Sequence, residues 1–202
     1  MLLSLDTETY KVEPGVLAPK LVCLTFSDGK RTGLLDRKDS LRFARKALSD
    51  HTVQLVGHRI SYDLAVLAAE DPELLPLIFD AFEQGRIFST DVRQKLIDIA
   101  QDQFKYYEFD GKKHKNKFSL AQASERYLSK KMNKGKGSWQ LRFSELDGVP
   151  ISEYPEEASK YALGDAIDTL LIKQAQDKYC EYEDIPTENL QTKAAFALHL
   201  MS

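Results

Sequence analysis

The first ten residues of the chain place two acidic side chains at the end of an apolar strand. Three leucines among the first five residues predict a buried strand over Leu2–Glu8, and Asp6 and Glu8 lie at its end. Alternate residues of a strand point to the same face, so the two carboxylates are expected side by side. Neighbouring negative charges disfavour each other unless a cation lies between them. The pair therefore predicts a divalent metal site, or else two solvated acids at a strand end.

The size and composition favour one sizeable domain. The chain has 202 residues, of which 43% are hydrophobic, enough for a packed core. Two cysteines make no disulfide framework, and acidic residues interrupt any apolar leader at the start. No apolar run approaches the length that spans a membrane. We therefore expect an intracellular protein, cytoplasmic in a bacterial or phage-infected cell, that is not secreted and has no membrane partner.

The order of elements predicts an α/β domain. Ser27–Lys30 has the composition of a turn between two strands of an antiparallel meander, and strands then alternate with helices. The predicted strands are Leu2–Glu8, Leu21–Phe26, Arg31–Leu35, Val53–Gly57 and Arg86–Ser89. The predicted helices are Ser40–Leu48, Tyr62–Ala69, Asp91–Ala100, Ser119–Leu128, Pro155–Tyr182 and Thr187–Leu200. This pattern is typical of a mixed sheet flanked by helices.

Three segments of the second half are expected to lie outside that sheet. Gln103–Lys117 and Ser129–Ser138 are polar and rich in lysine, and both are predicted to be loops. Thr187–Leu200 is predicted to be a separate amphipathic helix that needs another surface to pack on.

Further acids follow the first pair along the chain. Asp63 follows a predicted buried strand, with Ser61 as a plausible N-cap, and it can be a metal ligand or simply favour the helix dipole. Tyr161 and Asp165 are four residues apart on a predicted helix, so they share a face. Asp168 lies one turn on from Asp165. Asp91 begins a helix and is interpreted as its N-cap.

Taken together, these residues resemble a known group of enzymes. Asp6 with Glu8, then Asp63, then Tyr161 with Asp165 are similar to the three motifs of the 3′–5′ exonucleases that have four acidic metal ligands and a tyrosine. The resemblance implies a ribonuclease-H-like exonuclease fold with a mixed five-stranded sheet. It also implies two Mg²⁺ or Mn²⁺ ions, with all four acids as ligands.

Other segments narrow the resemblance to the proofreading domains of family A DNA polymerases of phage and bacterial type. Ile87–Ala100, Phe118–Ala121 and Arg126–Leu128 are similar to segments of those domains. Asn189–Ser202 is similar to the stretch where such polymerases enter their polymerase region. This implies an exonuclease domain over residues 1–183 and a linker and helix over residues 184–202. It also implies a polymerase domain in a longer chain as a partner.

The implied reaction is hydrolysis of a phosphodiester at a DNA 3′ end. Two metal ions about 4 Å apart activate a water and stabilise the leaving oxygen. We expect Asp6 to bridge both ions, Glu8 and Asp165 to bind the ion that activates water, and Asp63 to act through water on the other. Tyr161 is expected to orient the attacking water, since a phenol with a pKa of about 10 is a poor base. The product is a nucleoside 5′-monophosphate.

The substrate is expected to be a single-stranded or frayed DNA 3′ end. The Thr7 backbone is a candidate contact for the terminal sugar, and Tyr62 is a candidate for stacking on a base or binding a phosphate. Val12 or Leu17 is a candidate wedge between bases. Arg59 departs from the family, whose polymerases usually have Asn there, so we expect it to grip a phosphate or to point to solvent.

Basic residues gather in one part of an otherwise acidic chain. Between Gly111 and Arg142 there are ten Lys or Arg and a single acid, Glu125. Lys112, Lys113 and Lys115 are therefore candidate substrate-binding residues on a surface for single-stranded nucleic acid, the alternative being solvated loops. Two other functions stay open, an RNA-trimming exonuclease similar to RNase D and an inactive DNA-binding module. The complete set of acids with Tyr161 argues against the inactive module.

Overall fold

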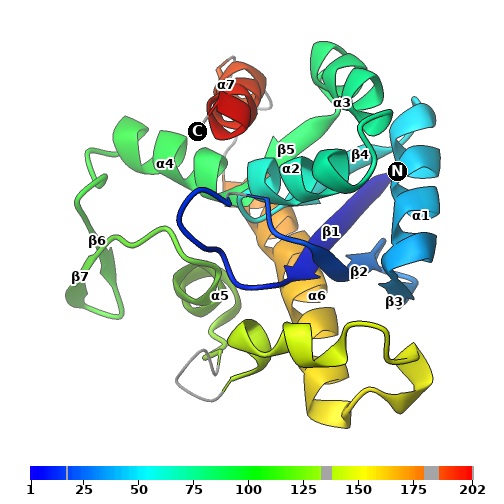
Figure 1. Cartoon of the computed structure of the whole chain (residues 1–202). Helices are drawn as coiled ribbons and strands as arrows, with labels where there is room; N and C mark the ends of the chain where they lie inside the picture. The colour runs from blue at the N-terminus through cyan, green and yellow to red at the C-terminus, as the bar shows by residue number, and fades with distance from the viewer. Residues whose placement is uncertain (17, 133–137, 180–186, 202) are drawn as a thin grey trace.

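The N-terminal strand β1 (Leu2–Thr9) lies at the centre of a mixed five-stranded sheet. The structure is a computed structural model, which describes all residues except 17, 133–137, 180–186 and 202 (Figure 1). The strand order is β3-β2-β1-β4-β5. β1 pairs antiparallel with β2, and β2 with β3, whereas β4 and β5 continue the sheet in parallel. The predicted α/β fold, a mixed five-stranded sheet flanked by helices, is confirmed.

The element bounds agree closely with the pattern of the sequence. The other four strands of the sheet are β2 (Leu21–Ser27), β3 (Thr32–Asp36), β4 (Gln54–Gly57) and β5 (Ile87–Ser89). The α-helices are α1 (Arg37–Ser49), α2 (Ile60–Glu70), α3 (Leu74–Glu83), α4 (Thr90–Ala100), α5 (Leu120–Leu128), α6 (Glu156–Tyr179) and α7 (Glu188–Met201). Three short 3₁₀ helices, Trp139–Leu141, Phe143–Leu146 and Ile151–Glu153, lead into α6. None of the helices among the described residues is long and apolar enough to cross a membrane.

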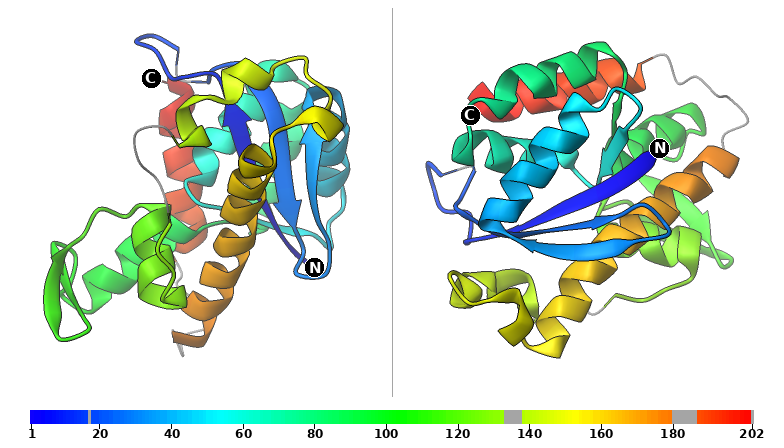
Figure 2. Two further views of the ribbon diagram at one scale, coloured as in Figure 1. Left: turned by 90° about the horizontal axis from the view of Figure 1, so that it is seen from below. Right: turned by 90° about the vertical axis from the view of Figure 1, so that its right-hand side faces the viewer.

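Alternation along β1 separates two sets of side chains. Leu3 and Leu5 belong to the main core, which also contains side chains of α1, α2 and α3. Ser4 lies on the opposite face, where its Oγ donates a 2.7 Å hydrogen bond to the carbonyl of Ala166 in α6. The sheet therefore lies between α6 on one face and α1, α2 and α3 on the other (Figure 2).

Small residues let α6 pack closely on the sheet. Ala158, Ala162 and Ala166 are fully buried and recur every four residues along the helix. The Oγ1 of Thr25 in β2 donates a 3.1 Å hydrogen bond to the carbonyl of Ala162. These contacts determine the position of α6 relative to β1.

Two segments differ from the expected structure. Gln103–Lys117 was predicted to be a loop, but it contains a hairpin of β6 (Tyr106–Phe109) and β7 (Lys112–Lys115). Tyr107 and His114 stack at 5.4 Å between ring centroids on one face of the hairpin. Tyr107 is buried there, with the guanidinium of Arg126 in α5 4.7 Å from its ring centroid. This aromatic face holds the hairpin on α5, a tertiary contact that a polar sequence does not reveal.

Helix α7 finds the surface it needs within this chain. Phe196 is fully buried in the main core, and its ring lies 5.6 Å from Phe79 and 5.5 Å from Phe82. Both partners belong to α3, a helix that was not predicted. Helix α7 also packs against α2 (Figure 1). The predicted resemblance of residues 184–202 to the start of a polymerase region is untested by this packing.

Candidate active site

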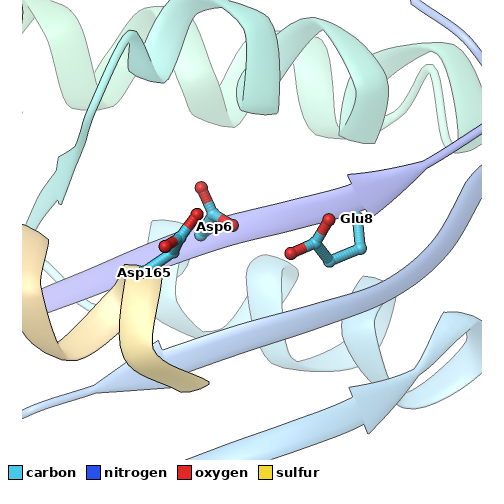
Figure 3. A group of neighbouring side chains, drawn as sticks. All are labelled: Asp6, Glu8 and Asp165. Carbon is cyan, nitrogen blue, oxygen red and sulfur yellow. The ribbon is translucent and has the colours of Figure 1, made fainter. Parts of the chain in front are cut away.

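Three of the four predicted acids come together at the junction of β1 and α6. Asp6, Glu8 and Asp165 each have a carboxylate oxygen within 4.8 Å of the others (Figure 3). Asp6 and Glu8 share the face of β1 that α6 covers, as their spacing predicted. Glu8 and Asp165 are buried, and Asp6 is half-buried. The fold therefore brings together the acids of the first and last predicted motifs.

The strand is irregular next to this cluster. The pairing of β1 with β2 shifts between Glu8, opposite Cys23, and Thr9, opposite Leu21. An extra residue in one strand of an antiparallel pair increases twist and re-aims the neighbouring side chains. The shift lies where the sheet ends and the cleft begins.

Asp63 lies on the other face of β1 and is not one of the clustered three. Its Oδ1 accepts hydrogen bonds from the Thr7 backbone N–H at 2.9 Å and from the Thr7 hydroxyl at 2.7 Å. Thr7 lies between Asp6 and Glu8 in sequence, so its side chain points the opposite way, toward α2. Asp63 is 3% exposed, and this burial raises its pKa to about 7.

The turn before α2 brings Asp63 to β1. A side chain at Gly57 would place a Cβ 2.9 Å from that of Ile60, so the tight turn from β4 into α2 requires glycine. Arg59 occupies the N-cap position with φ of 65°, a left-handed conformation, and its side chain makes no capping bond. The prediction of Ser61 as N-cap is therefore wrong, because the helix already begins at Ile60.

Tyr161 remains a phenol in this environment. It lies one turn before Asp165 on α6 and packs on the second core cluster, with its ring 6.1 Å from Phe143. Burial raises the pKa of Tyr161 above its ordinary value, and the charges of Asp165, Glu8 and Asp6 raise it further. Its hydroxyl is therefore protonated at neutral pH.

Two other acids considered in the sequence have structural roles. Asp168 is buried, and both of its oxygens accept hydrogen bonds of 2.8 Å from the Lys130 ammonium. Asp91 lies inside the first turn of α4, whose N-cap is Ser89, so its prediction as N-cap is wrong. Burial acts to raise the pKa of Asp91, but hydrogen bonds from Lys95 and Ser89 hold it below its ordinary value.

The donor set fits a hard divalent cation. Asp6, Glu8 and Asp165 offer only carboxylate oxygens, which suit Mg²⁺ and Mn²⁺ better than softer metals. Like charges this close also disfavour ionisation unless a cation compensates them. The cluster is therefore a candidate divalent-metal site, which agrees with the expected dependence on a metal.

The cluster opens into a cleft of about 860 Å³. Four of the predicted substrate contacts, Thr7, Arg59, Tyr62 and Val12, are among the residues that line it. The Tyr62 hydroxyl lies 2.6 Å from the Thr9 Oγ1. Leu17, the other candidate wedge, lies outside the described residues. Lys112, Lys113 and Lys115 are not among the residues that line the cleft but lie on the exposed hairpin β6–β7.

The cleft has contributors that the sequence pattern did not reveal. Ala195 and His199 of α7 line it, as does Lys95 of α4. Lys95 Nζ donates a 2.8 Å hydrogen bond to Asp91. The sequence offered no reason to expect Ala195 and His199 here, because their helix was predicted to be separate from the rest of the domain.

A comparison with known families now identifies the chain. A family model described as 3′–5′ exonuclease matches residues 2–178, most of the sequence. The chain belongs to this 3′–5′ exonuclease family. No curated protein matches the sequence.

Solved structures of exonucleases have the same fold. Brucella melitensis NrnC is similar with a TM-score of 0.65 at 18% identity, over 100% of this chain and 85% of that one. The Aedes aegypti Nibbler EXO domain is similar with a TM-score of 0.67 at 17% identity, over 96% and 85%. Escherichia coli RNase D, an exoribonuclease involved in structured RNA processing, is similar with a TM-score of 0.62 at 17% identity, over 98% and 44%. The predicted ribonuclease-H-like exonuclease fold is thereby confirmed.

Proposed function

We propose that this exonuclease removes nucleoside 5′-monophosphates from single-stranded or frayed DNA 3′ ends. The observation that carries the proposal is the convergence of Asp6, Glu8 and Asp165 beside a protonated Tyr161 at the end of an open cleft. The family membership supplies the class of reaction, and the choice of DNA rests on the sequence resemblance to proofreading domains.

The carboxylates would hold divalent ions, Mg²⁺ or Mn²⁺. Asp6, Glu8 and Asp165 would be the principal ligands. Asp63 would contribute through Oδ2, because both hydrogen bonds from Thr7 end on Oδ1. Bound ions would lower the pKa of a water to make the nucleophile and stabilise the charge that develops on the leaving oxygen.

The protein's own groups would then orient the reactants. Tyr161 would hold the attacking water through its hydroxyl, which its raised pKa keeps protonated. Thr7 would be restrained by Asp63, so that its backbone lies at a constant position beside the acids. Orientation of this kind lowers the barrier without any change in the chemistry of the groups.

Entry of a single strand agrees with the shape of the site. The cleft lies at the C-terminal end of β1, and Arg59, Tyr62 and Val12 line its walls. Val12 is 57% exposed, as a wedge between bases would need to be. Arg59 is exposed and would grip a backbone phosphate.

The hairpin β6–β7 would contact the strand beyond the cleft. Tyr106 is 48% exposed, and the Lys113 Nζ lies 5.0 Å from the centre of its ring. Lys112 and Lys115 are exposed beside it. Exposed aromatic rings among lysines suit single-stranded nucleic acid, because bases stack on the rings and phosphates pair with the ammonium groups.

The test of the reaction uses a 5′-labelled single strand of DNA with Mg²⁺ or Mn²⁺. A ladder that shortens from the 3′ end is expected for the native protein, and none for Asp6→Ala. Asp165→Asn and Asp168→Asn form a matched pair, since both acids are buried on α6 but only Asp165 belongs to the cluster. Activity in Asp168→Asn and its loss in Asp165→Asn is the expected result, whereas equal loss would contradict the assignment of the cluster.

The contribution of the hairpin is tested by the salt dependence of binding. Each ammonium group that neutralises a phosphate of a single strand adds about 0.7 to the slope of log K against log salt, so removal of three such groups lowers the slope by about 2. The test variant replaces Lys112, Lys113 and Lys115 by Gln. The control replaces three exposed lysines elsewhere, Lys30, Lys38 and Lys46. An equal slope in both variants would remove the hairpin from the binding surface.

A second candidate function is the trimming of RNA 3′ ends. It is favoured by the structural similarity to RNase D, whose substrate is RNA. The two substrates differ at the 2′-hydroxyl, which is how proteins distinguish RNA from DNA. A comparison of kcat/KM on DNA and RNA strands of one sequence decides between them, and a preference for RNA would replace the DNA proposal.

The proposed biological setting is proofreading within a longer polymerase chain. A polymerase domain that follows residue 202 would deliver a frayed 3′ end to the cleft. A primer with a mismatched end is then expected to be shortened faster than a matched one, because its end unpairs more readily. Equal rates on the two primers would argue against a proofreading role.

A further inference from the structure

Helix α7 forms part of the cleft although it lies beyond the segment that the family model matches. That match ends at residue 178, and α7 begins at Glu188. Ala195 and His199 of α7 line the same cleft as the three clustered acids. The two residues are four apart, so they share one face of the helix.

This helix is firmly attached to the domain. Phe196 is fully buried against the aromatic rings of α3. At the start of the helix, Glu188 accepts a 3.1 Å hydrogen bond from Arg93 of α4, and both side chains are 6% exposed. A third tie joins Lys193 to Glu83. The cleft-lining face of α7 therefore has a determined position.

His199 connects α7 to the strand of the acids. Its ring lies edge-on to that of Tyr62, at 6.0 Å between centroids and an angle of 85°. The Tyr62 hydroxyl in turn lies 2.6 Å from the Oγ1 of Thr9. Thr9 is the residue that follows Glu8 in the sequence. A side chain from the last turn of α7 is thus linked through Tyr62 to the end of β1.

We propose that His199 positions the substrate by donating a hydrogen bond to a backbone phosphate of the strand in the cleft. The inference rests on the proposed function and extends it to α7. A phosphate that enters a cleft with three clustered carboxylates needs donors on the walls away from them. An imidazole supplies such a donor through a ring N–H. Ala195, one turn earlier, keeps that wall low enough for the strand to pass.

The experiment measures binding separately from cleavage. A six-nucleotide DNA strand labelled at its 5′ end is titrated with the full chain in EDTA, and fluorescence anisotropy gives the Kd. His199→Ala is expected to weaken binding about tenfold, the usual effect of losing one hydrogen bond to a charged group, and His199→Gln to recover part of it. Ala195→Leu, which narrows the cleft, is expected to weaken binding as well.

Two control variants lie on the same helix. Ala197→Leu adds the same volume at a position that does not line the cleft, and Gln191→Ala shortens an exposed side chain outside it. Both are expected to bind as the native protein does. Melting temperatures of all the variants identify any that bind weakly because they are unfolded.

The outcomes separate this inference from the proposed function. Equal Kd values in His199→Ala, Ala195→Leu and Ala197→Leu would overturn the role of α7, while a ladder that depends on Asp6 would leave the exonuclease proposal intact. Loss of binding in His199→Ala from a protein that degrades no strand would support the role of α7 and overturn the proposed hydrolysis.

Discussion

Replacing Asp63 by Asn is expected to stabilise the metal-free protein at neutral and alkaline pH. The carboxyl group is 3% exposed, and burial raises its pKa from 3.8 to about 7. The folded state therefore holds the proton more firmly than the unfolded state does. The protonated Asp63 carboxyl therefore contributes stability to the folded state that is fully present below about pH 4 and is lost as the pH rises through 7.

The size of the effect follows from the shift in pKa. A difference of roughly three pKa units corresponds to about 4 kcal/mol of unfolding free energy above pH 7. Asn keeps the geometry, because its amide oxygen can accept both hydrogen bonds from Thr7 that now end on Oδ1. Since Asn carries no charge, the stability difference between variant and native protein should grow from near zero at pH 4 to its full value at pH 8.

Urea unfolding in EDTA at several pH values measures this difference. Asp91→Asn is the control with the opposite sign, because Lys95 and Ser89 hold the pKa of Asp91 below its ordinary value, which makes its ionised form stabilising at neutral pH. A constant difference between Asp63→Asn and the native protein across the pH range would refute the argument that a buried charge at Asp63 opposes folding.

Three further results are expected. Millimolar Mn²⁺ should raise the melting temperature, since saturation at 100 times Kd adds about 2.7 kcal/mol; Asp6→Asn should lose most of this rise, and a melting temperature indifferent to Mn²⁺ would contradict the metal site. Tyr161→Phe should lower kcat about 100-fold through a misplaced water while the rise with Mn²⁺ persists, and an unchanged kcat in a single-turnover assay would exclude that role. Phe196→Ala should destabilise the fold by about 3–5 kcal/mol in urea unfolding, because it empties a buried site between α7 and α3; a loss below about 1 kcal/mol would mean that α7 is only loosely attached.

The first and last motifs were predictable because their residues obey local periodicity. Asp6 and Glu8 share a face because a strand alternates, and Tyr161 and Asp165 share a face because a helix repeats about every four residues. Both relations depend only on neighbours in the chain. The same logic placed the strands of the sheet within a residue or two of their observed bounds.

Asp63 shows where local periodicity stops being informative. Its position after a strand and at a helix start was correctly predicted, but its partner was not. Thr7 separates Asp6 from Glu8, so the alternation that unites those two acids also directs Thr7 toward the opposite face. Which helix covers that face depends on how the chain crosses the sheet, and no local pattern encodes the crossing.

The hairpin and α7 depended on packing between distant segments. The hairpin holds to α5 through Tyr107 and Arg126, and α7 to α3 through Phe196. In both cases the sequence shows only one side of the contact, a polar stretch or an amphipathic helix, and not the surface that receives it. The sequence thus predicted the candidate metal ligands and, through the family resemblance that they carry, their class of chemistry. The tertiary structure decided which face each acid occupies and which helix completes the cleft, because burial of apolar side chains joins segments that are far apart in the chain.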